Sequence, residues 1–190
     1  MWNLVTVPFG RVVRTTFVFF NKTKQYTDKV KIDTGYFGGY IMIIIRAEKG
    51  DLQKILDLQY LAYQSEARLF DNQDIPPLKQ TLTDVENEYQ KGIILKALDD
   101  NKAIIGSVRA FCDNGTVYIG KLMVHPSKQG QGIGTQLLLE MENQYPKQRY
   151  ELFTSTRSEK NIALYQKLGY KIYDEKQVTE ELRFVYMQKG

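Results

Sequence analysis

The sequence predicts an α+β fold with a mixed, mostly antiparallel sheet flanked by helices. Strand-like and helix-like segments follow one another without the strict alternation that builds a parallel sheet. Two turn sequences, at residues 99–101 and 113–115, connect neighbouring strand-like runs as hairpins do. The chain has 190 residues, of which 43% are hydrophobic. This is enough for one sizeable core, so we expect a single domain.

The first well-patterned elements lie before residue 93. Residues 41–46 form a continuous apolar run typical of a strand, and Asp51 is placed to cap the helix that follows. One face of that helix is formed by Leu52, Ile55, Leu56, Gln59, Ala62 and Tyr63. The sequence from Thr83 to Glu86 has the pattern of a capping box, which predicts a second helix that ends at Gly92.

Three strands are expected in the middle of the chain, at residues 93–98, 103–111 and 116–124. The third is followed by His125 and Pro126, and proline cannot donate to a strand ladder. A helix comes next, with apolar residues at helical spacing and Pro146 as its stop. These residues are Ile133, Leu137, Leu138, Met141 and Tyr145. The last elements expected are a strand at 149–155, a helix from about 159 to 168, and strands at 170–173 and 182–187.

The most informative segment is the glycine-rich turn between the third of these strands and the leucine-rich helix. It consists of Gln129, Gly130, Gln131, Gly132, Ile133 and Gly134. Glycines on alternate positions let a ligand approach the backbone, and the N-terminus of the next helix offers free N–H groups and a positive dipole to a phosphate. The segment predicts an anion cradle, although a tight turn without a ligand would use the same residues.

Two familiar phosphate-binding motifs do not fit this segment. A P-loop would place Gly-Lys-Ser/Thr after a four-residue gap, whereas Gly134 is followed by Thr135 and Gln136. The dinucleotide fingerprint would place its third glycine where this chain has Leu137.

The segment resembles the acyl-coenzyme A (CoA) cradle of the GNAT N-acetyltransferases, whose pattern is Gln/Arg-x-x-Gly-x-Gly/Ala after a strand. Gln129, Gly132 and Gly134 match that pattern. Similarity at residues 41–52 and 161–170 extends the resemblance over most of 42–190. It implies the GNAT fold, acetyl-CoA as cosubstrate, and acetyl transfer to an amine by direct attack in a ternary complex.

The resemblance also implies roles for residues outside the turn. Backbone N–H groups on the strand before the cradle would pair with the pantetheine amides and polarise the acetyl carbonyl. These belong to Leu122, Met123 and Val124. Asn161 would hydrogen-bond the pantetheine arm, and Tyr165 would serve the leaving thiolate as general acid. They lie four apart on one face of a helix that Ser158 is placed to cap, a spacing that ordinary packing would also produce.

The general base is not fixed by the sequence. An attacking amine must be neutral, yet a lysine-like amine has a pKa of about 10.4. Some family members have a glutamate on the fourth strand where this chain has Tyr118, a poor base at neutral pH. Glu66 near the end of the first helix is the next candidate, with a solvated surface carboxylate as its alternative interpretation. A water relay touching Tyr118 is a third possibility, and His125 is interpreted as a turn residue.

The acceptor is indicated only weakly. In similar enzymes the segment 65–78 covers the acceptor side, and its acidic residues suit a small amine or a lysine or N-terminal amine of a peptide. Arg68 argues against a purely acidic site. A non-catalytic acyl-CoA-binding module, or an acetyltransferase acting on a protein or on aminoacyl-tRNA, stays an alternative. Action on RNA would be expected to come with a stronger basic face. A homodimer is left open.

Composition excludes several other classes. The formal net charge is +4 and the basic residues are dispersed, so no nucleic-acid partner is expected. One cysteine and one histidine allow neither an intrachain disulfide nor a Cys/His metal site, so no metal is expected. No apolar run is long enough to span a bilayer and no convincing signal peptide is present, so we expect a cytoplasmic protein without a membrane partner.

Residues 1–41 are interpreted as an N-terminal extension to a GNAT domain at 42–190. The extension would be an added strand or a disordered arm. A second interpretation follows from the genetic code, because the codons for Gly38 and Gly39 can supply a ribosome-binding sequence about seven nucleotides before that for Met42. Translation from Met42 would leave residues 1–41 outside the native protein.

Overall fold

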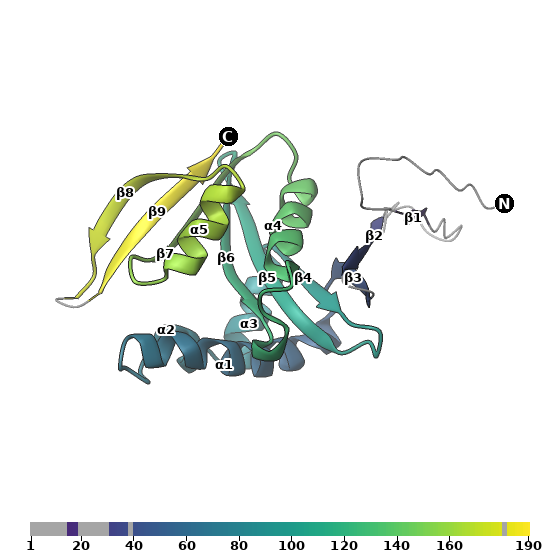
Figure 1. Cartoon of the computed structure of the whole chain (residues 1–190), viewed down its shortest axis with the longest axis horizontal. Helices are drawn as coiled ribbons and strands as arrows, with labels where there is room; N and C mark the ends of the chain where they lie inside the picture. The colour runs from purple at the N-terminus through teal and green to yellow at the C-terminus, as the bar shows by residue number, and fades with distance from the viewer. Residues whose placement is uncertain (1–14, 19–30, 38–39, 180–181) are drawn as a thin grey trace.

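The fold is a single twisted sheet with helices on both faces (Figure 1). The computed structural model describes residues 15–18, 31–37, 40–179 and 182–190. The strand order is β1-β2-β3-β4-β5-β6-β7-β9-β8. Among the strands described, β6 and β7 alone pair in parallel. This confirms the predicted α+β class with a mixed, mostly antiparallel sheet.

The elements have the following bounds. The strands are β1 (Thr15–Val18), β2 (Lys31–Phe37), β3 (Tyr40–Arg46), β4 (Ile93–Leu98), β5 (Ile104–Asp113), β6 (Thr116–Val124), β7 (Arg149–Ser155), β8 (Lys171–Gln177) and β9 (Arg183–Lys189). The helices are α1 (Leu52–Leu69), α2 (Pro76–Lys79), α3 (Leu82–Lys91), α4 (Ile133–Gln144) and α5 (Glu159–Lys167), with short 3-10 turns η1 (Lys49–Asp51) and η2 (Pro126–Lys128).

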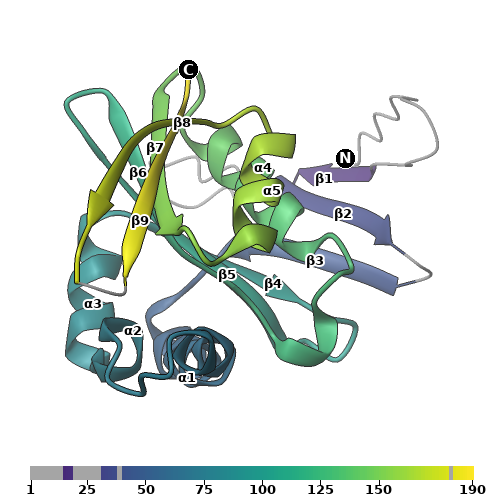
Figure 2. The same cartoon turned by 60° about the vertical axis from the view of Figure 1, so that its left-hand side comes forward.

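The core is divided by the sheet, as Figure 2 shows with α4 and α5 on the opposite side from α1. Strand side chains alternate between the faces, so each face has its own buried cluster. On one face, Leu137 of α4 and Tyr165 of α5 belong to the same buried cluster as Val108 of β5. On the other face, Ile55 of α1 and Val85 of α3 belong to the same buried cluster as Ile94 of β4.

The N-terminal strands β1 and β2 extend the sheet beyond β3 by antiparallel pairing. The remaining residues before β3 (1–14, 19–30 and 38–39) lie outside the described part of the chain. The division into an extension at 1–41 and a domain at 42–190, and the alternative start at Met42, stay predictions.

The helix caps differ from those expected. The predicted capping box at Thr83–Glu86 is wrong: the cap of α3 is Thr81, whose hydroxyl accepts from the Asp84 backbone N–H while the Asp84 carboxylate accepts from the Thr81 N–H at 2.7 Å. Starting two residues earlier lets Leu82 pack against the core. The predicted end of this helix at Gly92 is confirmed.

Asp51 and Ser158 are wrong as side-chain caps, although both stand at N-cap positions. The Asp51 carboxylate instead accepts from the buried Lys96 ammonium at 2.5 Å and from the Glu48 N–H at 2.7 Å, where it completes a capping box on η1. A buried charge needs an opposite charge beside it, which explains why Asp51 does not cap α1. The Ser158 hydroxyl donates to Glu66, a contact that belongs to the site described below.

Arg109 on β5 holds the helices of one face. Its guanidinium donates to Glu88 of α3 at 2.6 Å, to Gln80 at 3.0 Å and to the fully buried Gln59 of α1 at 2.7 Å. A buried guanidinium with several acceptors fixes the elements that supply them, because each partner would be costly to leave unbonded. Arg109 therefore fixes α1 and α3 against the sheet.

Candidate active site

The site lies where β6 and β7 separate. The two strands pair at Thr116–Arg149, Val117–Tyr150 and Tyr118–Glu151, and no pairing follows although β6 continues to Val124 and β7 to Ser155. Backbone groups of Leu122 to Val124 on the β7 side therefore have no neighbouring strand to bond. This is the stretch predicted to bind the pantetheine arm through its N–H groups.

A β-bulge sits at this separation. Arg109 pairs with Gly120 and Ser107 with Met123, so Lys121 and Leu122 lie opposite one residue of β5. Lys121 has φ 52°, a left-handed value that is uncommon outside glycine. This bulge was not predicted from the sequence, although Gly120 inside a strand pattern was a usable signal.

The bulge directs Lys121 toward α1. Its ammonium nitrogen lies 6.0 Å from the centre of the Tyr63 ring. Burial lowers the pKa of Lys121, with nearby Glu88 opposing and Arg109 reinforcing that shift. A cation thus lies beside the first helix, a feature that sequence reasoning did not identify.

The glycine-rich turn has the expected strand–turn–helix order. Gly130 has φ 75° and Gly132, the N-cap of α4, has φ 79°, so both use the left-handed conformation that glycine adopts freely. The Gln129 side chain donates to the Val124 carbonyl at 3.3 Å and ties the turn to the end of β6. The first N–H groups of α4 are free of intrahelical partners, as in any helix N-terminus.

Gly134 differs, because it lies inside the first turn of α4. A Cβ atom built there would meet Leu164 at 3.6 Å, and Leu122 and Val124 at 3.8 Å, which are ordinary contacts. The fold alone would therefore accept alanine at this position. Close approach of a ligand gives a physical reason for glycine, and these residues fit the phosphates and arm of CoA.

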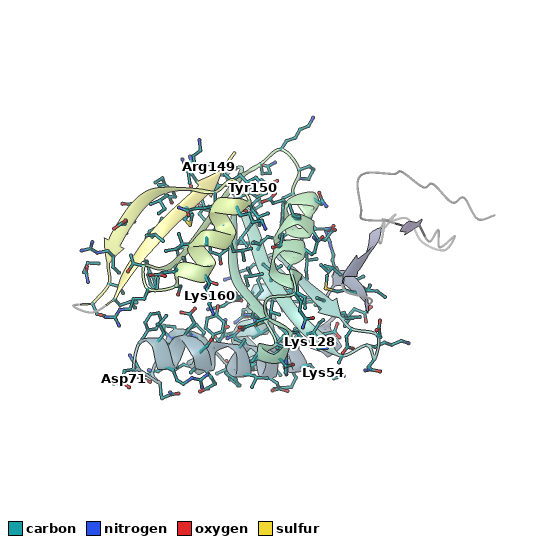
Figure 3. The ribbon with its side chains drawn as sticks, viewed as in Figure 1. Lys54, Asp71, Lys128, Arg149, Tyr150 and Lys160 are labelled. Carbon is teal, nitrogen blue, oxygen red and sulfur yellow. The ribbon has the colours of Figure 1, made fainter. Side chains whose placement is uncertain are left out.

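Glu66 joins α1 to the start of α5. Its carboxylate accepts from the Ser158 hydroxyl at 3.1 and 3.2 Å and from the Asn161 amide at 3.4 Å. Figure 3 shows the first turn of α5, marked by Lys160, over α1. Burial raises the pKa of Glu66, and the two hydrogen bonds reduce that rise. Glu66 is thus a half-buried, bonded carboxylate, not the solvated surface group of the alternative interpretation.

Tyr165 lies one turn beyond Asn161 and is 7% exposed. Burial raises its pKa, with Tyr63 and Glu66 adding to the shift, so it is protonated at physiological pH. Its ring packs edge-on against Tyr170, with centroids 6.1 Å apart. Its hydroxyl makes no hydrogen bond to any residue that the structure describes, and so is available to a ligand.

Tyr118, the other candidate, and the turn residue His125 share no hydrogen bond with Glu66, Asn161 or Tyr165 within the described residues. Tyr118 is 38% exposed and stacks on Phe111, with ring centroids 5.2 Å apart. Its hydroxyl has no hydrogen bond within the described residues. His125 is a turn residue, as predicted: its Nδ1 accepts from the Ser127 N–H at 3.3 Å at the start of η2.

The comparisons with known proteins identify the family. The family described as acetyltransferase (GNAT) domain matches residues 62–190. The chain belongs to the GNAT family. The enzyme class expected from the sequence, an N-acetyltransferase, is thereby confirmed, as is acetyl transfer from acetyl-CoA in general terms. No curated protein matches the chain.

Several solved GNAT structures share the fold. The PaiA N-acetyltransferase from Thermoplasma acidophilum in complex with CoA has a TM-score of 0.66 and 16% identity, over 78% of this chain and 98% of that one. The ribosomal-protein-S18-alanine N-acetyltransferase from Escherichia coli has a TM-score of 0.63 and 17% identity, over 77% and 92%. A phosphinothricin acetyltransferase from Sinorhizobium meliloti in complex with acetyl-CoA has a TM-score of 0.62 and 17% identity, over 78% of this chain and 87% of that one.

The other expectations for this GNAT chain are tested less directly. None of the helices within the described ranges is long and apolar enough to cross a membrane. The same residues contain no group of three or more histidine, cysteine or acidic side chains that could hold a metal ion. A cytoplasmic location stays a prediction, and a homodimer stays open.

Replacing Gly134 tests the cradle. Gly134→Leu should fill the space beside Leu164 and Leu122 and weaken acetyl-CoA binding by roughly tenfold or more, with little change in melting temperature. Isothermal titration calorimetry measures the affinity. Gly50→Leu is the matched control, because nothing lies within 4 Å of a Cβ built at Gly50. Equal affinity in Gly134→Leu and the parent would contradict the cradle.

Proposed function

We propose that this acetyltransferase transfers the acetyl group of acetyl-CoA to a primary amine by direct attack in a ternary complex. One observation carries the proposal: Glu66, Asn161 and Tyr165 come together beside the stretch of β6 that β7 leaves unpaired. The neighbouring Leu164 lies against Gly134 at the N-terminus of α4. An ionisable carboxylate, a phenol and an anion cradle are thus held together.

The cosubstrate would lie along the separation of the strands. Residues 129–134 would hold its phosphates through backbone N–H groups and the positive end of α4. The backbone of Leu122 to Val124 would pair with the pantetheine amides and polarise the acetyl carbonyl. Asn161 would exchange its long 3.4 Å bond to Glu66 for one to the pantetheine arm. The presence of CoA or acetyl-CoA in two of the similar structures supports this assignment.

The reaction forms one bond and breaks another. The amine nitrogen attacks the thioester carbonyl carbon, the C–S bond breaks, and the sulfur leaves as a thiolate. The attacking amine must shed a proton, and Glu66 is our candidate base because its partners are a neutral hydroxyl and a neutral amide. We keep a water relay touching Tyr118 as the alternative route for that proton.

Tyr165 would act on the leaving group. A CoA thiol has a pKa near that of cysteine, about 8.5. The ordinary pKa of a tyrosine hydroxyl is about 10, and burial raises the pKa of Tyr165 further. Complete proton transfer from Tyr165 to the thiolate would therefore be uphill. Its contribution would be a hydrogen bond that stabilises the developing negative charge on sulfur.

The fold does not specify the acceptor. The similar structures are named for acceptors as different as a ribosomal-protein alanine, phosphinothricin and spermidine. We propose a small amine or a peptide amine. Incubation with acetyl-CoA and a panel of amines, followed by thiol detection and mass spectrometry of the acceptor, tests this. An N-acetylated product supports the proposal, and CoA release without such a product in any reaction contradicts it.

Tyr165→Phe keeps the ring and removes the hydroxyl. At saturating acetyl-CoA, turnover should fall by roughly ten- to a thousandfold with little change in cofactor affinity, as expected for a lost charge-stabilising hydrogen bond. Tyr170→Phe is the matched control, since it removes the hydroxyl of the adjacent buried ring, which donates to Glu142 at 3.0 Å. If Tyr165→Phe keeps full turnover and only melts earlier, Tyr165 is a packing residue.

The Ser158 hydrogen bond should set the pH dependence. Activity that needs ionised Glu66 is lost as pH falls through the pKa of that group. The bond from Ser158 stabilises the carboxylate and lowers this pKa, so Ser158→Ala should move the acidic limb of kcat/KM to higher pH. Ser65→Ala is the control, because the Ser65 hydroxyl donates to the Ala62 carbonyl of its own helix at 2.9 Å and to no other residue in the described ranges. An unshifted limb in Ser158→Ala would argue against Glu66 as the base.

A further inference from the structure

Six aromatic side chains gather on one face of the sheet, which we call the aromatic face. They are Phe111, Tyr118, Phe153, Tyr173, Phe184 and Tyr186. Phe153 is 55% exposed and Phe111 is 47% exposed. Arg149 lies over the Tyr173 ring and Lys176 over the Tyr186 ring, which leaves Phe111 and Phe153 as the phenylalanine rings most open to water. A contiguous patch of exposed apolar surface marks a binding site, whereas single exposed side chains need no explanation.

The pairing registers place these residues on the α1 side of the sheet. Arg109 points to that side, because its partners lie on α1 and α3. Phe111 is two residues farther along β5 and pairs with Tyr118. Tyr118 pairs with Glu151 on β7, and Phe153 follows two residues later and so shares the same side.

The aromatic face continues across β7 and β9, which together with the edge strand β8 form one end of the sheet (Figure 2). The Phe153 ring lies 5.1 Å from that of Phe184 and 5.6 Å from that of Tyr186. The intervening residues of these strands, such as Leu152 and Met187, point to the opposite side into the core with α4 and α5. The core therefore does not need the aromatic residues.

The aromatic face adjoins the candidate active site at two places. Phe153 lies two residues before the end of β7, and the chain then reaches Ser158, which binds Glu66. On β6, Tyr118 lies two residues before Gly120, where the bulge begins. An amine held at Glu66 would thus carry the rest of its molecule toward these rings.

The charges near this entrance favour a single cation on the acceptor. Glu66 can receive one ammonium group. Lys121 beside Tyr63 makes no hydrogen bond or ion pair with any described residue, so its charge is not neutralised by direct contact. A second positive charge on the acceptor would meet Lys121 and be repelled.

We propose that the acceptor is a monoamine whose amino group is attached to an aromatic or bulky apolar body that packs on the aromatic face, chiefly on Phe153. This inference rests on the proposed function and specifies its substrate class. The amine nitrogen forms an amide bond with the acetyl carbon, the C–S bond breaks, and the CoA thiol and one proton are released.

Kinetics with matched amines test the proposal. The acceptors are 2-phenylethylamine, n-propylamine, spermidine and a short peptide with N-terminal phenylalanine, which separates a free arylalkylamine from a peptide source. Two of these acceptors are aromatic, 2-phenylethylamine and the peptide. Burial of one ring on the aromatic face predicts that the better of the two has a kcat/KM about tenfold or more above that of n-propylamine and that of spermidine. Phe153→Ala should lower that value roughly five- to twentyfold, mainly through KM, and leave n-propylamine within about twofold.

Ile172→Ala is the matched control. Ile172 is 42% exposed on the neighbouring β8, but it pairs with Met187, whose side chain points to the opposite face. This variant should leave kcat/KM unchanged for the better aromatic acceptor and for n-propylamine.

Three results would overturn the inference. The first is an equal kcat/KM for the aromatic acceptors and for n-propylamine, which would show no apolar recognition. The second is a loss of kcat/KM in Phe153→Ala that is as large for n-propylamine as for the aromatic acceptors. Analytical ultracentrifugation showing a dimer that Phe153→Ala dissociates would make the aromatic face an interface between copies. If no amine is acetylated, the proposed function fails as well, whereas acetylation without preference removes this inference alone.

Discussion

The separation of β6 from β7 is the constraint on which the site depends. A parallel pair requires a crossover, and here α4 provides it. The chain leaves β6 at Val124, turns through residues 129–134 and enters α4, so the helix N-terminus lies at the end of β6 that β7 has left. Unpaired strand backbone and the positive end of a helix therefore occur together because of the topology. The bulge at Lys121 increases the twist at the same point.

Two polar groups on the α1 side, the buried Arg109 and the half-buried Glu66, differ in what surrounds them. Arg109 has charged and polar partners on α1, α3 and the segment between them, and such a guanidinium is fixed in charge and position. Glu66 has no cationic partner among the described residues; its bonds come from Ser158 and Asn161. Burial raises its pKa without an opposing charge to hold it ionised. A group in that state can exchange a proton, which is why it stands out from the structural ion pairs.

The regular elements could be predicted because their signals are local. Alternation and flanking turns placed β6 at 116–124 and β7 at 149–155, as the structure has them. Asn114 and Gly115 both have positive φ, which the turn sequence anticipates. The caps failed because Asp51 and Ser158 bind partners from distant segments, Lys96 and Glu66, that no local pattern encodes. The bulge and the position of Lys121 depend on register, which short-range pattern does not determine.

Strand alternation also separates the two halves of the site. In the proposed complex, cofactor binding would rely on backbone groups, glycines and α5, whereas the side chains that face α4 and α5 form the core. The acceptor would meet side chains of the other face, where Phe111 and Phe153 contribute little to the core. Substitutions on that face can change the acceptor without disturbing the core or the cradle. Solved structures named for a ribosomal-protein alanine, phosphinothricin and spermidine share this fold with the chain at 16–17% identity, which agrees with a fold that leaves its acceptor side free to vary.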